Sequence, residues 1–181
     1  MEFNKSVSNP MLMGCIQLMR AEDTPEHRSM FVEELVKASF QAPAIIEPAP
    51  VRDATGNLAI ASGSRVQFPM LVTKDGKKFF MGFTDSVEYR KWTERDKELP
   101  CFALKFDDYV NMLFRKDAQG NDCPALGIVL NPMGDNVVVP KEMVAGIVAA
   151  RSGQLQQMAA RRAAAKKASE ENGSGEIKLK F

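Results

Sequence analysis

Few residues in this 181-residue sequence could carry acid–base or nucleophilic chemistry. His27 is the only histidine, so an acid–base mechanism near neutral pH would depend on it or on a carboxylate with a shifted pKa. His27 lies between Glu26 and Arg28 in the first turn of a predicted helix, a position that favours an exposed, solvated side chain. We therefore expect no catalytic role for this histidine.

The three cysteines, Cys15, Cys101 and Cys123, are odd in number and widely spaced. No CxxC motif or Cys/His cluster is present, so the spacing predicts neither a disulfide framework nor a zinc site. A Cys/His nucleophile pair would require one thiol to meet His27 in space, and nothing in the spacing favours that. We interpret the cysteines as small, partly buried thiols in a reducing compartment, and we expect no metal and no cofactor.

Polar residues follow two predicted strands, where they could form a site. Thr84 and Asp85 end one strand, and the turn from Asn131 to Asp135 follows another. Sites in open α/β sheets often form at such strand ends, so one hypothesis is a pocket built from Thr84, Asp85, Asn131 and Asp135. The simpler interpretation is a turn between strands. The glycines lack the spacing of a phosphate-binding loop.

A stretch from Val66 to Trp92 organises the chain. Residues 66–73 and 78–83 alternate as two strands, and Gly76 in the turn between them is expected to take positive φ. Asp85 is placed to cap a helix, with Glu88 completing a capping box. Tyr89 and Trp92 share one side of that helix. They either anchor it to the sheet or form the centre of a binding patch.

The remaining segments add strands and capped helices. The pairs Asn9–Pro10 and Thr24–Pro25 predict two helix starts, and Asp107 and Asp108 are expected to cap a later helix. Further strands are predicted over 42–46, 101–106, 125–130 and 136–139, with a last helix from Pro140. The pattern predicts an α+β fold: a single domain with a mixed, mostly antiparallel sheet of about five strands and packed helices.

The ordered motifs resemble a known family. The segment FPMLVTKDGKKFFMGFTDSVEYRKW and the later GIVLNP are similar to the N-terminal domain of the SseB family, over roughly Asn9 to Ala150. The resemblance implies a fold and assigns no catalytic residue. Where a second SseB domain could follow, this sequence has a short tail. We therefore expect an SseB-like N-terminal domain over 1–153 and an extension over 154–181.

The extension combines three kinds of segment. An Ala/Lys-rich stretch favours helix, a Gly/Ser linker follows, and residues 176–181 then alternate like a strand. Ile177, Leu179 and Phe181 fall on one side of that strand, with Lys178 and Lys180 on the other. Such a segment is suited to pairing with a sheet edge of its own domain, of a second copy or of a partner.

Composition narrows the function class. No run approaches the ~20 apolar residues of a membrane helix, and the N-terminus lacks a signal-peptide pattern, so we expect a cytoplasmic protein that does not bind membranes. The formal net charge is +1, and its distribution favours no nucleic-acid partner. We expect a non-enzymatic SseB-type domain that binds a protein partner or forms a homo-oligomer. The alternative is a small-molecule binding or enzymatic domain with a pocket near Asn131–Asp135.

Overall fold

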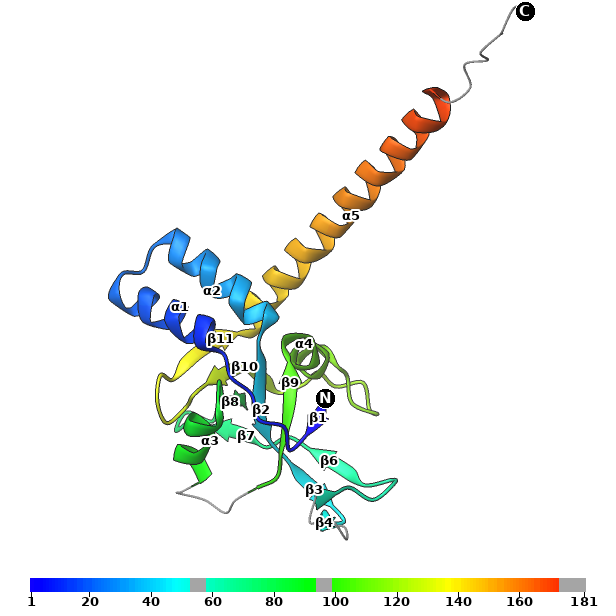
Figure 1. The fold of residues 1–181 in the computed structure, drawn as a ribbon. Helices are drawn as coiled ribbons and strands as arrows, with labels where there is room; N and C mark the ends of the chain where they lie inside the picture. Colours follow the sequence, from blue (N-terminus) through cyan, green and yellow to red (C-terminus); the bar gives the residue numbers. More distant parts are fainter. Residues whose placement is uncertain (53–57, 94–98, 173–181) are drawn as a thin grey trace, which may run out of the picture. The chain divides into compact units, whose positions relative to one another are not determined.

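The computed structural model describes residues 1–52, 58–93 and 99–172 (Figure 1). The chain divides into two units, Met1–Val144 and Ala145–Phe181, and the boundary falls within the last helix. The elements in chain order are β1 (Glu2–Phe3), α1 (Pro10–Ala21), α2 (Pro25–Lys37), β2 (Ser39–Pro43), β3 (Ile45–Glu47), β4 (Val51–Arg52), β5 (Leu58–Ala59), β6 (Arg65–Gln67), β7 (Met70–Val72), β8 (Lys78–Gly82), α3 (Ser86–Thr93), β9 (Cys101–Lys105), α4 (Phe106–Phe114), β10 (Ala125–Leu130), β11 (Val137–Pro140) and α5 (Lys141–Asn172).

Two sheets form the centre of the first unit. One has the order β11-β10-β8-β7, with β8 and β10 parallel, and the other is antiparallel with the order β1-β9-β2. Gln41 and Phe83 join them by two reciprocal backbone hydrogen bonds, each 2.9 Å long. The α+β class and the mixed, mostly antiparallel pairing are therefore confirmed.

The predicted number of strands, about five, was too low. The described residues contain eleven strands. The predicted strand 42–46 is divided between β2 and β3, and β1 and the short pair β4–β5 add strands that the predicted number did not include. The predicted strand 66–73 is divided between β6 and β7, on either side of Phe68 and Pro69. Proline lacks the N–H that a continuous ladder needs at this point.

Helices α1 and α2 form the predicted helical hairpin and lie side by side in Figure 1. Thr24 caps α2, since its side-chain oxygen accepts a hydrogen bond from the His27 backbone N–H at 3.1 Å. Both helices turn an apolar stripe inward. The buried residues are Leu12, Cys15 and Ile16 in α1, and Phe31 and Leu35 in α2.

Helix α3 is anchored by the two aromatic residues that could also have formed a binding patch. Tyr89 and Trp92 are each only 8% exposed, and their rings lie 5.3 Å and 6.0 Å from the Phe83 ring, centroid to centroid. The Tyr89 hydroxyl also donates a hydrogen bond to the Leu99 carbonyl at 2.6 Å. The binding-patch interpretation is therefore wrong, because burial leaves these rings no surface for a partner.

Local capping differs from prediction in two details. Asp85 caps α3 as expected, accepting from the N–H groups of Val87 and Glu88 at 2.8 and 2.9 Å, but the Glu88 carboxylate pairs with Lys91. At α4 the helix begins at Phe106, two residues before the start that Asp107 as its cap would give. The capping carboxylate there is that of Asp108, which accepts from the Lys105 N–H at 2.9 Å.

The turn between β7 and β8 gives a stability prediction. Gly76 has φ +78°, as predicted, whereas Gly14 lies in α1 with open space around it. We expect Gly76→Ala to lower the free energy of unfolding by more than about 1 kcal/mol, because a Cβ is strained at positive φ. The matched change Gly14→Ala should raise it by about 0.5–1 kcal/mol. Urea denaturation measures both, and equal effects of the two changes would contradict the assigned turn.

Candidate functional site

The four residues of the predicted pocket do converge, at the ends of β8 and β10. These strands are parallel, with Leu130 opposite Gly82, so the residues that follow them meet at one edge of the sheet. The Asn131 amide donates to the Thr84 hydroxyl at 2.9 Å and to an Asp135 carboxylate oxygen at 3.3 Å. The Thr84 hydroxyl in turn donates to Asp85 at 3.3 Å.

This cluster is a buried network and not the lining of a pocket. Thr84 and Asn131 are both 0% exposed, and the Asn131 side-chain oxygen accepts from the Thr84 backbone N–H at 2.9 Å. Asp85 is used as a helix cap. The prediction of a pocket lined by all four residues therefore needs correction, because Thr84 and Asn131 are hydrogen-bonded to each other inside the protein. Asp135 does line a cavity, which is described below.

Asn131 also shapes the loop that follows it. Its φ is +48°, in the left-handed region that asparagine tolerates better than most residues. Its carbonyl accepts from the N–H groups of Gly134 and Asn136 at 2.9 and 2.8 Å. Its own N–H donates to the Gly82 carbonyl at 2.9 Å. One residue thus closes the 131–136 loop and fastens it to β8.

Asn9 also binds the chain at the end of β8. It precedes α1 as predicted, but its side chain makes no capping hydrogen bond to the helix. Its amide instead donates to the carbonyls of Ser39 and Thr84, each at 2.7 Å. The start of α1 is therefore tied to the start of β2 and to the end of β8.

The strongest candidate site is a groove between the α1–α2 hairpin and β11. Its volume is about 430 Å³, within the range of sites that take ligands. We call it the hairpin groove and define it by the residues that line it: Ile16, Met19, Arg20, Asp23, Arg28, Phe31, Asp135, Asn136, Val137, Val138 and Met143. Apolar side chains from both helices, from β11 and from the first turn of α5 contribute most of this lining.

The charged residues that line the groove form two ion pairs. Arg20 reaches from α1 to Asp135, with 2.7 Å between Nη1 and Oδ1. Arg28 binds Asp23 through two hydrogen bonds, at 2.6 Å from Nε and 2.5 Å from Nη2. The guanidinium of Arg28 lowers the pKa of Asp23, chiefly through this hydrogen bonding. All four charges thus have an opposite charge beside them before any ligand arrives.

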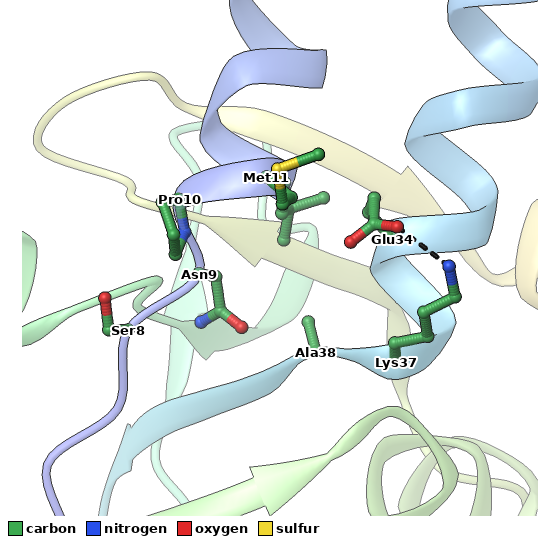
Figure 2. A pocket seen from close by; sticks show the side chains of 8 residues that line it. Ser8, Asn9, Pro10, Met11, Glu34, Lys37 and Ala38 are labelled. Carbon is green, nitrogen blue, oxygen red and sulfur yellow. Dashed lines mark hydrogen bonds and ion pairs between the residues drawn. The ribbon is translucent and has the colours of Figure 1, made fainter.

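Two other cavities are less suited to ligand binding. One, shown in Figure 2, lies beside the start of α1 and the end of α2 and has a volume of about 180 Å³. Glu34 and Lys37 form an ion pair there, with 2.8 Å between Oε1 and Nζ. Asn9 faces this cavity, but its polar atoms already bind backbone groups. The other, of about 390 Å³, lies along the polar loop between α4 and β10 and includes the half-buried Cys123.

The residues weighed for catalysis are not brought together into a recognisable site. His27 lies at the start of α2 with Nδ1 2.6 Å from the Glu22 carbonyl oxygen. Cys15 and Cys101 are buried, and burial raises the pKa of both thiols, which opposes thiolate formation. Among the described residues, no three His, Cys, Asp or Glu side chains are grouped to hold a metal ion. In the same part of the chain, no helix is long and apolar enough to cross a membrane.

Sequence reasoning missed most of the hairpin groove. Of its lining, only Asp135 was among the predicted site residues. The groove residues Ile16, Arg20, Arg28 and Phe31 lie in the two helices of which the starts were predicted. The signal available in the sequence was the apolar pair Val137–Val138. In the structure, Val138 is 48% exposed. The predicted interaction residues Ile177, Leu179 and Phe181 lie outside the described residues.

The buried network gives a second stability prediction. Asn131→Ala removes the acceptor of the buried Thr84 N–H, and we expect a loss of about 1–3 kcal/mol in unfolding free energy beyond any backbone strain. Asn136→Ala is the matched control, because Asn136 has a similar φ of +50° but an exposed side chain. Urea denaturation of both variants gives the difference. Equal losses would show that the backbone conformation, and not the network, determines the effect.

Comparison with known proteins identifies the family. The family model for the SseB protein N-terminal domain matches residues 14–146. Searches of curated proteins and of solved structures each returned no match. The matched range includes α2, all the strands from β2 to β11 and most of α1, so it includes every residue that lines the hairpin groove. The chain therefore belongs to the SseB family, as the resemblance of its central hairpin and its GIVLNP strand implied.

Proposed function

We propose that this SseB-type domain is a non-enzymatic protein-interaction domain and that the hairpin groove is its binding surface. The observation that carries this proposal is the lining of the groove. An apolar floor of Met19, Val137 and Met143 adjoins charged side chains that are already paired. Such a surface suits an extended polypeptide segment that inserts apolar side chains and leaves the polar rim intact.

The size of the groove sets the expected strength of binding. A volume of about 430 Å³ accommodates two or three side chains, each contributing about 1.5–3 kcal/mol when fully buried. Loss of translational and conformational freedom offsets much of this gain. We therefore expect reversible binding with a Kd on the order of micromolar.

Small-molecule binding or catalysis near Asn131–Asp135 is the second candidate. Its support is the presence of Asp135 and Asn136 in the groove lining. A charged small ligand at Asn131–Asp135 would have to separate Arg20 from Asp135, which also accepts from Asn131, before it could use their charges. The protein-binding proposal requires no such step, and for that reason we favour it.

We propose that the domain acts in the cytoplasm and does not bind nucleic acid. All three cysteines are free thiols, which is usual for a reducing compartment. Of the 24 basic and 23 acidic residues, 17 and 20 lie in residues 1–150, so that part has a formal charge of −3. A negative body is unfavourable for contact with phosphate backbones.

One pair of substitutions tests the binding surface. Val138 lies in the groove and is 48% exposed, whereas Val72 is 57% exposed on another edge strand, outside the groove. We expect Val138→Glu to abolish recovery of a protein partner or of a second copy, because a carboxylate placed in the lining of the groove would be desolvated on binding. Val72→Glu should behave as wild type.

The measurement combines affinity capture on the purified full chain with sedimentation velocity. Any captured protein is then purified, and its Kd for wild type and for both variants is measured by calorimetry. Urea denaturation confirms that both variants are folded. If Val138→Glu retains the same proteins, affinities and sedimentation as wild type, the hairpin groove is not an interaction surface.

A further inference from the structure

We infer that the occupant of the hairpin groove is the segment 176–181 of a second copy of this chain, added as an extended strand beside β11. This inference rests on the proposed function, since it identifies the partner of the same groove. Four observations support it: the free edge of β11, the alternation of the segment, the charge of the two parts of the chain and the length of α5.

The first observation is the free edge of β11. In the described part of the chain β11 pairs only with β10. The Asn131 N–H points to β8, where it binds the Gly82 carbonyl. Backbone N–H and C=O groups alternate in direction along a strand. Those of Leu130 therefore point to β11, and those of its partner Val137 point back to β10. Val138, one residue on, therefore turns its N–H and C=O toward the edge that β10 leaves free.

The second observation is how the segment would fill the groove. In an extended strand, Ile177, Leu179 and Phe181 project to one face, while Lys178 and Lys180 project to the other. The apolar face matches the apolar floor of the groove. Val138 alone provides only two main-chain hydrogen bonds, because Pro140 has no N–H. The apolar side chains must therefore supply most of the affinity, and the strand edge sets the direction and register.

The third observation is charge complementarity. From Arg151 onward the chain has seven basic and three acidic residues, a formal charge of +4, against −3 for residues 1–150. Opposite charges on the two parts favour their encounter and accelerate association. The same distribution makes association sensitive to ionic strength, because exposed charges are screened by salt.

The fourth observation distinguishes a second copy from the same chain. Helix α5 continues to Asn172, and its 29 residues after Met143 give a rise of about 43 Å. The nine residues 173–181 span at most about 32 Å when fully extended. While the helix is intact, the segment is therefore too short to span back along α5 to its first turn, which contains Met143 of the groove. A second copy can supply it.

The test is sedimentation velocity of the full chain over a range of concentrations. We expect wild type and Val72→Glu to form dimers as concentration increases, with weaker association at high salt. The double variant Ile177→Asp with Leu179→Asp should stay monomeric, and so should Val138→Glu. A mixture of these two monomeric variants should form a heterodimer, because one chain keeps its groove and the other keeps its segment.

The outcomes separate this inference from the proposed function. If the double variant dimerises as wild type does while Val138→Glu is monomeric, the groove binds a second copy through another segment, and only this inference is overturned. Wild type that remains monomeric at all concentrations also overturns it, and capture of a different protein through the groove would still support the proposed function. Absence of a heterodimer in the mixture would exclude exchange of the segment between copies.

Discussion

Two parallel strands that end at the same sheet edge leave buried polar groups that need partners, and the Asn131 side chain supplies them. It accepts from the Thr84 backbone N–H inside the protein, where an unpaired N–H would cost about 1–3 kcal/mol. The same residue closes the following loop through its carbonyl and donates to Asp135. Asp135 in turn forms an ion pair with Arg20 of α1. The position of one wall of the hairpin groove relative to the α1 wall thus depends on a hydrogen-bonded chain that begins at a strand end.

Much of the local fold could be predicted because its determinants lie within a few residues of one another. Thr24 before Pro25, Asp85 before α3 and Gly76 in its turn each act on neighbours no more than three residues away. Sheet connectivity has a different origin. The parallel pairing of β8 with β10 joins segments about fifty residues apart, and short strands such as β4 lack the length that makes alternation visible.

The candidate site was predicted only in part, for a related reason. The convergence of Thr84 with Asn131 follows from strand ends in parallel register, which the order of elements suggests. Whether they are exposed depends on what packs against them. Asn9, just before α1, binds the Thr84 carbonyl, and Met13 of α1 contacts the Asn131 amide. The groove combines residues 16–31 with residues 135–143. Each segment alone appears as an ordinary amphipathic helix or a short strand, so only the tertiary arrangement reveals the cavity between them.

The pairing of charges at the groove has a consequence for specificity. The two ion pairs differ in their surroundings: both Arg28 and Asp23 are more than half exposed, whereas the Asp135 side chain is only 14% exposed. Exposed pairs contribute little to stability, so Arg28 and Asp23 can exchange partners readily. Asp135 is also bound to Asn131, and separating it from Arg20 would disturb the buried network. The groove therefore has one adaptable charged side and one fixed side. Under the proposed function, such a surface would favour segments whose own charges approach the Asp23 side, and it would disfavour ligands that compete for Arg20.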